Sequence, residues 1–424
     1  LTMARKMKDS GIEWIGEIPE GWTKNKVIRL FDTIGSGTTP KNITSDFPVV
    51  NWIQSGDITG SFMPACKNVI SANLLSQYSA LKVYPAPFII IAMYGASVGN
   101  ASISLIDGCV NQACCVLSSP SCNLHYAFYV IKSAQSYLVR KAVGGGQPNI
   151  SQETIKQLWL PLPPLSTQDI IVRNLDATCS KIDDLLSSVH ASIEEYKKLK
   201  QAVITQAVTK GVRGEREMKD SGVEWIGKVP SKWNCIKIKY LFEIRKRIAG
   251  KEGYTVLSIT QTGIKPKNIS SNEGQLADSY SNYQLLHFGE FAMNHMDLLT
   301  GWVDISNYNG VTSPDYRVFS LKDTITNHPR YFLYLMQMCY FNRIFYSMAQ
   351  GVSNLGRWRL QSDKFLNCIF PVPSIEEQKE ISAYLDTTCS EIDKLIAKKE
   401  QLVKELESYK KSLIYEVVTG KREV

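Results

Sequence analysis

The chain has 424 residues, enough for two or three domains with substantial cores. With 44% apolar and 21% charged residues, its composition is that of a globular protein and excludes a disordered or fibrous one. The formal net charge of +8 favours an acidic partner such as nucleic acid, but it is too small to identify one alone.

The first recognisable element is a 16-residue tryptophan motif at residues 7–22, which returns at residues 218–233. MKDSGIEWIGEIPEGW becomes MKDSGVEWIGKVPSKW, with eleven identical positions at an offset of 211. Residues 175–185 and 385–395 form a second pair, identical at eight of eleven positions at an offset of 210. Two copies are too few for a solenoid, so the sequence predicts two related halves with pseudo-two-fold symmetry.

In each half a body of about 135 residues follows the tryptophan motif, and short strands alternate with loops in it. In the first body we expect strands at residues 49–54 and 88–93 and an amphipathic helix at residues 126–141. In the second body a strand is expected at residues 254–259 and a helix at residues 330–348. The bodies are therefore predicted to be mixed α/β domains.

A proline-rich joint ends each body, LPLPP at residues 160–164 and FPVP at residues 370–373, and a long helix is expected to follow. Ser374 and Glu377 fit a capping box at the start of the second helix. The comparable pair in the first copy is Ser166 with Asp169.

Both predicted helices have apolar residues at the alternating four- and three-residue spacing of a coiled coil. Each helix is about 40 residues and roughly 60 Å long, and the two-fold relation between the halves predicts that they pack antiparallel. The predicted seam comprises Leu175, Ile182, Leu186, Val189, Ile193, Leu385, Ile392, Ile396, Val403 and Leu406. Lys200 and Lys410 share one heptad position where an apolar residue is expected. They either extend to water, fix the register or contact a partner subunit.

The net positive surplus is confined to the two bodies. Residues 22–158 carry ten basic and five acidic side chains, residues 233–367 carry fifteen and ten, and the remainder has a net charge of −2. This equal division between two bodies spaced by helices favours a protein that binds two DNA half-sites.

The candidate DNA contacts lie in glycine-rich or basic loops. In the glycine-rich loops the backbone can approach phosphates closely, and the side chains of Arg, Asn or Gln can pair with base edges. For any one loop the alternative is a solvated turn without a DNA contact. The predicted contacts are Lys41, Asn42, Gln147, Asn149, Arg245, Lys246, Arg247, Lys265, Lys267, Arg357 and Arg359.

No catalytic motif is found. The sequence lacks G-x-x-x-x-G-K-[ST], G-x-S-x-G, H-E-x-x-H and the Asn/Asp-Pro-Pro-aromatic tetrapeptide with which amino-methyltransferases hold the target amine. None of the ten cysteines forms C-x-x-C and the five histidines are isolated, so no metal site is expected. Adjacent Cys114 and Cys115 are a candidate redox pair, but packing in the core is favoured. We expect a binding subunit without a cofactor.

The location predicted from the sequence is the cytoplasm. Prolines and glycines interrupt the longest uncharged stretch, residues 83–106, so no membrane helix is expected, and no apolar run typical of a signal peptide follows the first charged residues. Scattered cysteines are typical of reduced thiols.

The chain resembles the specificity subunit of type I restriction-modification systems. The resemblance rests on the repeated tryptophan motif, the P-x-P joint leading to Glu376–Gln378, and the helix endings at residues 208–211 and 418–421. The segments GSGTTP, from Gly35, and NWIQSGD, from Asn51, are similar to the opening of many target-recognition domains in this family. The motifs cover the whole chain in the family's order.

One residue departs from the family pattern: Thr167 stands before Gln168 in the first joint, where the family more often has Glu. Sequence and resemblance together predict an α+β fold, in which two mixed α/β target-recognition domains are each followed by a long helix and the helices form an antiparallel coiled coil. The expected boundaries are residues 1–160 for the first domain, 161–210 for the central conserved helix, 211–370 for the second domain and 371–424 for the distal conserved helix.

The resemblance implies that each domain recognises one half of a bipartite, asymmetric sequence in double-stranded DNA. The helices would set the spacer and dock two modification (methyltransferase) subunits together with restriction subunits. S-adenosylmethionine, ATP and Mg²⁺ would belong to those partners. Two other functions stay open: a fused restriction-methylation enzyme, whose motifs are missing here, and a coiled-coil structural or chaperone-like protein with no DNA preference.

Overall fold

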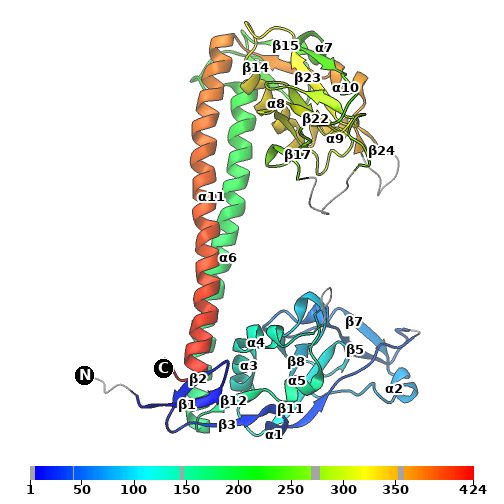
Figure 1. Ribbon diagram of the computed structural model, residues 1–424. Helices are drawn as coiled ribbons and strands as arrows, with labels where there is room; N and C mark the ends of the chain where they lie inside the picture. The colour runs from blue at the N-terminus through cyan, green and yellow to red at the C-terminus, as the bar shows by residue number, and fades with distance from the viewer. Residues whose placement is uncertain (1–4, 42, 144–147, 269–276, 352–357) are drawn as a thin grey trace. The chain divides into compact units, whose positions relative to one another are not determined.

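The computed structural model describes residues 5–41, 43–143, 148–268, 277–351 and 358–424 (Figure 1). The chain forms two compact units. Unit 2 is His190–Glu400, whereas unit 1 combines the residues up to Val189 with Gln401–Val424. Both long helices therefore contribute residues to both units. Among the described residues, no helix combines the length and apolar character that crossing a bilayer requires.

The core of unit 1 is built around a five-stranded sheet with the order β4-β11-β8-β9-β6. Strand β8 (Phe88–Ala92) is buried along its whole length because β9 and β11 pair with it antiparallel and α3 (Leu124–Ser133) packs on the sheet. The helix expected at residues 126–141 is divided at Ala134 into α3 and α4. The other elements are β1 (Met7–Ile12), β2 (Gly16–Pro19), β3 (Thr23–Lys26), α1 (Val27–Leu30), β4 (Phe31–Gly35), β5 (Val49–Ile53), β6 (Phe62–Met63), β7 (Asn68–Ser71), α2 (Leu74–Gln77), β9 (Ala101–Ser104), β10 (Cys109–Val110), β11 (Cys114–Pro120), α4 (Gln135–Arg140), α5 (Gln152–Lys156) and β12 (Trp159–Leu162).

Unit 2 repeats this plan with a four-stranded sheet of order β16-β23-β20-β21, which corresponds to β4-β11-β8-β9. Helix α8 (Pro329–Phe341) starts with a proline, whose missing N–H would be unpaired there in any case, and packs against β21. The other elements are β13 (Met218–Asp220), β14 (Lys228–Pro230), β15 (Asn234–Lys237), α7 (Ile238–Leu241), β16 (Phe242–Arg245), β17 (Leu257–Thr260), β18 (Gly263–Pro266), β19 (Gln284–Leu286), β20 (Phe291–Met293), β21 (Val303–Ile305), β22 (Gly310–Thr312), β23 (Arg317–Leu321), α9 (Ile344–Ser347), β24 (Gln350–Gly351), β25 (Trp358–Arg359), α10 (Ser362–Asn367) and β26 (Ile369–Val372).

The two long helices are α6 (Leu165–Lys210) and α11 (Ile375–Val418). The predicted capping box is present only in its Ser374 half: the Ser374 hydroxyl accepts a hydrogen bond from the Glu377 N–H at 3.4 Å, whereas the Glu377 carboxylate accepts from Arg216 and Trp233. The comparable prediction for Ser166 and Asp169 is wrong. Helix α6 begins at Leu165, directly after the joint prolines, so Ser166 lies inside the first turn.

Helix segments pack antiparallel within each unit, and the internal repeat is visible in their contacts. In unit 1 Lys410 pairs with Asp183 at 2.6 Å, while the Tyr126 hydroxyl lies 2.8 Å from the Pro161 carbonyl and 3.1 Å from that of Val418. Unit 2 repeats these contacts through one equivalent set of residues, Lys200, Asp393, Tyr331, Pro371 and Val208. The predicted antiparallel packing and internal repeat are confirmed.

The end of each helix completes the core of one unit. Leu413 and Val417 of α11 belong to the core of unit 1, and Ile204 and Val208 of α6 belong to that of unit 2. Each buried aliphatic side chain of this kind contributes on the order of 2 kcal/mol to folding. The body in each half is therefore completed by the helix that follows the body of the other half.

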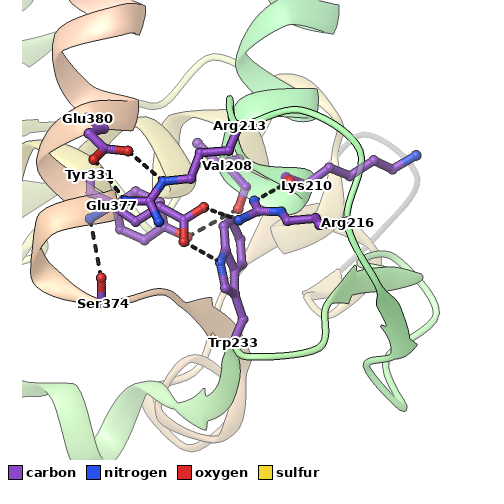
Figure 2. Close-up of polar contacts among 9 residues, drawn as sticks. All are labelled: Val208, Lys210, Arg213, Arg216, Trp233, Tyr331, Ser374, Glu377 and Glu380. Carbon is purple, nitrogen blue, oxygen red and sulfur yellow. Dashed lines mark hydrogen bonds and ion pairs between the residues drawn. The ribbon is translucent and has the colours of Figure 1, made fainter.

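A buried carboxylate joins the second body to its helices (Figure 2). Glu377, in the first turn of α11, accepts hydrogen bonds from Arg216 Nη1 at 2.5 Å and from Trp233 Nε1 at 3.0 Å. Arg216 also donates to the Lys210 carbonyl at the end of α6, and its guanidinium lies 5.4 Å from the centroid of the Trp233 ring. This cluster ties the second tryptophan motif to both helices.

Unit 1 lacks the carboxylate of this cluster because Thr167 occupies the position that corresponds to Glu377. Arg5 still lies 5.4 Å from the centroid of the Trp22 ring. The buried Trp22 Nε1, however, has no hydrogen-bond partner among the described residues. The one departure from the family pattern noted in the sequence thus removes a polar bridge from one unit only.

We predict that Glu377→Thr, which installs the residue of the first repeat, lowers the free energy of unfolding by about 2–4 kcal/mol. The substitution leaves Arg216 and Trp233 without a buried acceptor. Chemical denaturation followed by tryptophan fluorescence measures the effect. The matched control is Glu380→Gln, which breaks the exposed Arg213–Glu380 pair at 2.8 Å and is expected to change little. If the two substitutions lower the free energy of unfolding equally, burial of the Glu377 carboxylate does not explain its effect on stability.

Candidate nucleic-acid interface

Strand order gathers several loops at one edge of the main sheet in each unit. Because neighbouring strands are antiparallel, the ends of β4 and β8 meet the starts of β11 and β9. The first loop edge, as we define it, contains residues 36–41, 93–100, 111–113 and 148–149. The same argument for unit 2 defines a second loop edge with residues 246–250, 294–302, 313–316 and 358–360.

Hydrogen bonds between distant segments hold the first loop edge together. Ser36 donates to the Cys114 carbonyl at 2.7 Å, the Met93 N–H donates to Ala113 at 2.7 Å, and the Gly95 N–H donates to Pro148 at 3.1 Å. A Cβ atom at Gly37 would lie 1.6 Å from the Val110 carbonyl oxygen, so only glycine fits there. The Gly35–Gly37 segment is therefore required by close backbone packing at this edge.

The second loop edge carries more basic side chains. Lys246 and Arg359 are exposed, whereas Arg247 is half-buried in an ion pair with Glu290. Arg317, at the start of β23, is 4% exposed and donates to the Leu360 carbonyl at 2.9 Å and to Ser362 Oγ at 3.2 Å. Basic side chains at a loop edge suit a polyanion such as DNA.

Two of these buried groups have strongly perturbed pKa values. Burial, together with the positive charges of Arg317 and Arg359, lowers the pKa of His295 to about 3, so its ring is neutral at physiological pH. Burial lowers the pKa of Arg317 to about 10, which leaves it charged. His295 Nδ1 is buried and has no hydrogen-bond partner among the described residues. The interior behind the second loop edge is therefore electropositive.

The predicted DNA contacts are distributed unevenly over this geometry. On the loop edges or at the strand ends that lead to them lie Lys41, Asn149, Arg245, Lys246, Arg247 and Arg359. Lys265 is exposed on the β17–β18 hairpin and Lys267 follows it, so neither belongs to the second loop edge as defined. Asn42, Gln147 and Arg357 lie outside the described residues.

Two of the predicted arginine contacts already have partners within the body. Arg245 pairs with Glu243 at 2.9 Å and donates to Ser320 at 2.9 Å, and Arg247 pairs with Glu290. Lys41 and Lys246 are exposed, and Asn149 bridges to Tyr94 across the first loop edge. Contact with DNA stays a prediction for all of them.

The predicted helix seam is buried or half-buried throughout. Leu175 and Leu385 are fully buried, and exposure increases toward the middle of each helix, where Val189 and Ile396 are half-buried. Lys200 and Lys410 sit beside this seam and pair with an aspartate of the other helix. Of the alternatives left open by the sequence, these pairs favour a role in fixing the register.

Sequence reasoning did not single out several side chains on the loop edges. Tyr94 is 45% exposed where β8 ends, Gln112 accepts a hydrogen bond from Thr39, and His295 and Arg317 lie behind the second edge. The sequence signal for this loop was the pair of glycines that follows Tyr94. Gly95 and Gly99 both have positive φ angles, which favour glycine.

A groove of about 1240 Å³ also opens in unit 2, between α8, the loop before β21 and the paired helices. Two of its charged residue pairs are matched internally: Arg330 pairs with Asp386 at 2.7 Å, and Lys200 pairs with Asp393 at 2.7 Å. The groove is therefore less suited than the second loop edge to bind a polyanion.

Groups that could perform redox or metal chemistry are buried or dispersed. Cys114 and Cys115 are fully buried, and burial raises the pKa of the Cys115 thiol to about 12, so neither is a reactive thiolate. Within the described ranges, no three His, Cys, Asp or Glu side chains gather in a way that could hold a metal ion.

Comparisons with known proteins agree with the two related halves of the chain. The family described as "Type I restriction modification DNA specificity domain" matches residues 19–195 and 230–405, one copy in each half. The MjaVIII specificity subunit of Methanocaldococcus jannaschii is 25% identical over 310 residues, which cover 70% of this chain and 69% of that protein. The EcoBI specificity subunit of Escherichia coli is 21% identical over 399 residues, 86% and 82% of the two chains.

Two solved structures share the fold. A chain of a type I R-M system assembly has a TM-score of 0.70 at 14% identity and covers 95% of this chain and 98% of its own. The HsdS subunit from Thermoanaerobacter tengcongensis has a TM-score of 0.50 at 14% identity, with coverage of 96% and 98%. At this identity the likeness concerns the fold.

Proposed function

This chain belongs to the family of type I restriction-modification DNA specificity subunits, and we propose that each loop edge binds one half of a bipartite, asymmetric DNA sequence. The observation that carries the proposal is the shared strand order of the two bodies, which brings candidate contact residues to the corresponding edge in each. The equal positive surplus of the two bodies supports it further.

The long helices are proposed to set the distance between the half-sites and to dock the partner subunits. Exposed apolar residues on the helices support the second role, because they repeat at an offset of 210: Leu185 with Leu395, and Leu199 with Tyr409, each 41–53% exposed. Each unit thus has one such residue from each helix. Large exposed apolar side chains at repeated positions favour two equivalent protein contacts, one for each of two modification subunits.

We propose that the chain itself is not catalytic. S-adenosylmethionine, ATP and Mg²⁺ are assigned to the modification and restriction subunits, and the cytoplasm is the proposed location because DNA is the ligand. Eight of the ten cysteines are buried and the other two, Cys66 and Cys235, are half-buried, and within the described residues no His, Cys, Asp and Glu side chains cluster in a way that could hold a metal ion. A labelled-methyl transfer assay on the isolated chain is expected to show no incorporation into DNA.

We predict that the chain, purified with its methyltransferase partner, selects one bipartite duplex from a random DNA library. Its affinity is expected to fall steeply with salt, because each neutralised phosphate adds about 0.9 to the slope of log K against log salt. Lys41→Gln combined with Lys246→Gln should lower the affinity. The control is Lys404→Gln, an exposed lysine on α11. A library in which no sequence is enriched would favour the structural-protein alternative.

We also predict that one extra heptad in both helices lengthens the preferred spacer. Duplicating residues 186–192 and 396–402 adds about 10 Å to each helix, or about three base pairs, and keeps the heptad register. Both half-site sequences are expected to stay the same in the selected library. A control insertion in one helix only breaks the pairing and should abolish selection. An unchanged spacer in the double insertion would refute the proposed ruler.

Docking is tested by placing charge on one repeated apolar pair. Leu185→Asp with Tyr409→Asp alters unit 1 alone and should leave one methyltransferase copy bound instead of two, as measured by native mass spectrometry. The control Ser187→Asp adds charge at an exposed polar position of α6 and should keep two copies. Retention of two copies by the double variant would place the contact elsewhere.

A further inference from the structure

We propose that Arg359 recognises a guanine in the half-site bound by unit 2 and that the buried Arg317 positions it. This inference rests on the proposed function and adds the chemistry of one base contact. It is carried by the backbone alternation of strand β25, by the hydrogen bonds that anchor that strand, and by the absence of an acidic partner for either arginine among the described residues.

Strand alternation directs Arg359 away from the body. Trp358 is half-buried, with its ring centroid 4.7 Å from that of Tyr346, and Leu360 is fully buried. Because successive side chains of an extended chain point to opposite sides, Arg359 between them must point outward, and it is exposed. Its backbone pairs with Gln350 in the two-stranded β24–β25 ribbon.

The segment that carries Arg359 is anchored to the main sheet. The Leu360 N–H donates to the His295 carbonyl at 2.9 Å, and Arg317 Nη2 donates to the Leu360 carbonyl at 2.9 Å. The Arg317 guanidinium lies 4.7 Å from the centroid of the Phe365 ring, which fixes its plane. The residue next to Arg359 is thus held on both backbone groups, so its side chain starts from a defined position.

Among the described residues, the two arginines at this edge have no acidic counter-ion. Neither Arg317 nor Arg359 forms an ion pair with a described carboxylate, unlike Arg245 and Arg247 nearby, which pair with glutamates. Arg317 has hydrogen-bond acceptors but no described carboxylate to neutralise it, so its buried charge raises the positive potential at the second loop edge. The ring of His295 adds no charge of its own, because burial and the two nearby arginines lower its pKa and keep it neutral. The arrangement therefore favours an electron-rich ligand.

Guanine is the base that matches this geometry. A two-stranded ribbon fits the major groove, where guanine presents the O6 and N7 acceptors side by side, and the planar guanidinium fork can bond both. The first loop edge differs, because Lys41 is the one charged side chain among its residues as defined. The half-site bound by unit 1 should therefore depend on neutral hydrogen-bonding groups.

The test compares base-preference profiles of the complete complex with its methyltransferase partner. Arg359→Gln is expected to reduce the preference for guanine at one base pair of one half-site by about 5- to 150-fold and to leave the other half-site unchanged. Arg359→Lys keeps the charge but not the fork, so it should relax the same base pair. The control is Lys364→Gln, which removes a positive charge from the neighbouring helix α10.

Arg317→Lys tests the positioning role. It should weaken the preference at the same base pair and at no other, an effect that a loss of stability alone would not produce. Should that variant fail to fold, Ser362→Ala removes one of the Arg317 contacts at the surface instead. If Arg317→Lys or Ser362→Ala folds and keeps the full preference for guanine at that base pair, the positioning role of Arg317 is wrong.

The remaining outcomes separate the two proposals. Suppose that the complex without substitutions selects a sequence, that Arg359→Gln weakens binding to all duplexes equally, and that Arg359→Lys binds normally. Arg359 then contacts a phosphate, and the guanine assignment is wrong. The guanine assignment is also wrong if Arg359→Gln relaxes the preference at a base other than guanine or leaves every base preference unchanged. If the complex without substitutions selects no sequence, the proposed function itself is wrong.

Discussion

The antiparallel pairing of helix segments within each unit is the constraint on which the rest of the structure depends. It places the end of α11 in the core of unit 1 and the end of α6 in the core of unit 2. The hydroxyls of Tyr126 and Tyr331 close this arrangement, since each lies within hydrogen-bond distance of a joint proline carbonyl and of a helix-end carbonyl. Neither body has a complete core without the helix from the other half.

The repeated scaffold contrasts with the divergent loop edges that it carries. Joints, tyrosines and lysine–aspartate pairs recur with the same contacts in both units, whereas the second loop edge gathers arginines that the first lacks. A protein that binds two different half-sites at a fixed spacing requires this division. Even within the scaffold, Glu377 has no counterpart at Thr167, so the two bodies are joined to the helices with different chemistry.

Sequence periodicity predicted the fold well because the signals are local. The heptad spacing located α6 and α11, and the tryptophan motif revealed the repeat. The exchange of helix ends was not predicted, because apolar stripes of the same heptad spacing specify a partner helix but not which body that helix completes. The loop edges were predicted only in part. Arg245 and Arg317 differ in role because Arg245 pairs with Glu243 on its own strand, whereas Arg317 donates to the carbonyl of Leu360, a residue 43 positions away in the sequence.

The exchange of helix ends is tested most directly by producing residues 1–211 and 212–424 as two separate chains in one cell. If each body needs the helix end supplied by the other half, the two chains must co-purify as a stable one-to-one complex, and each alone must be unstable or aggregate. Two independently folded monomers that do not associate would contradict the account.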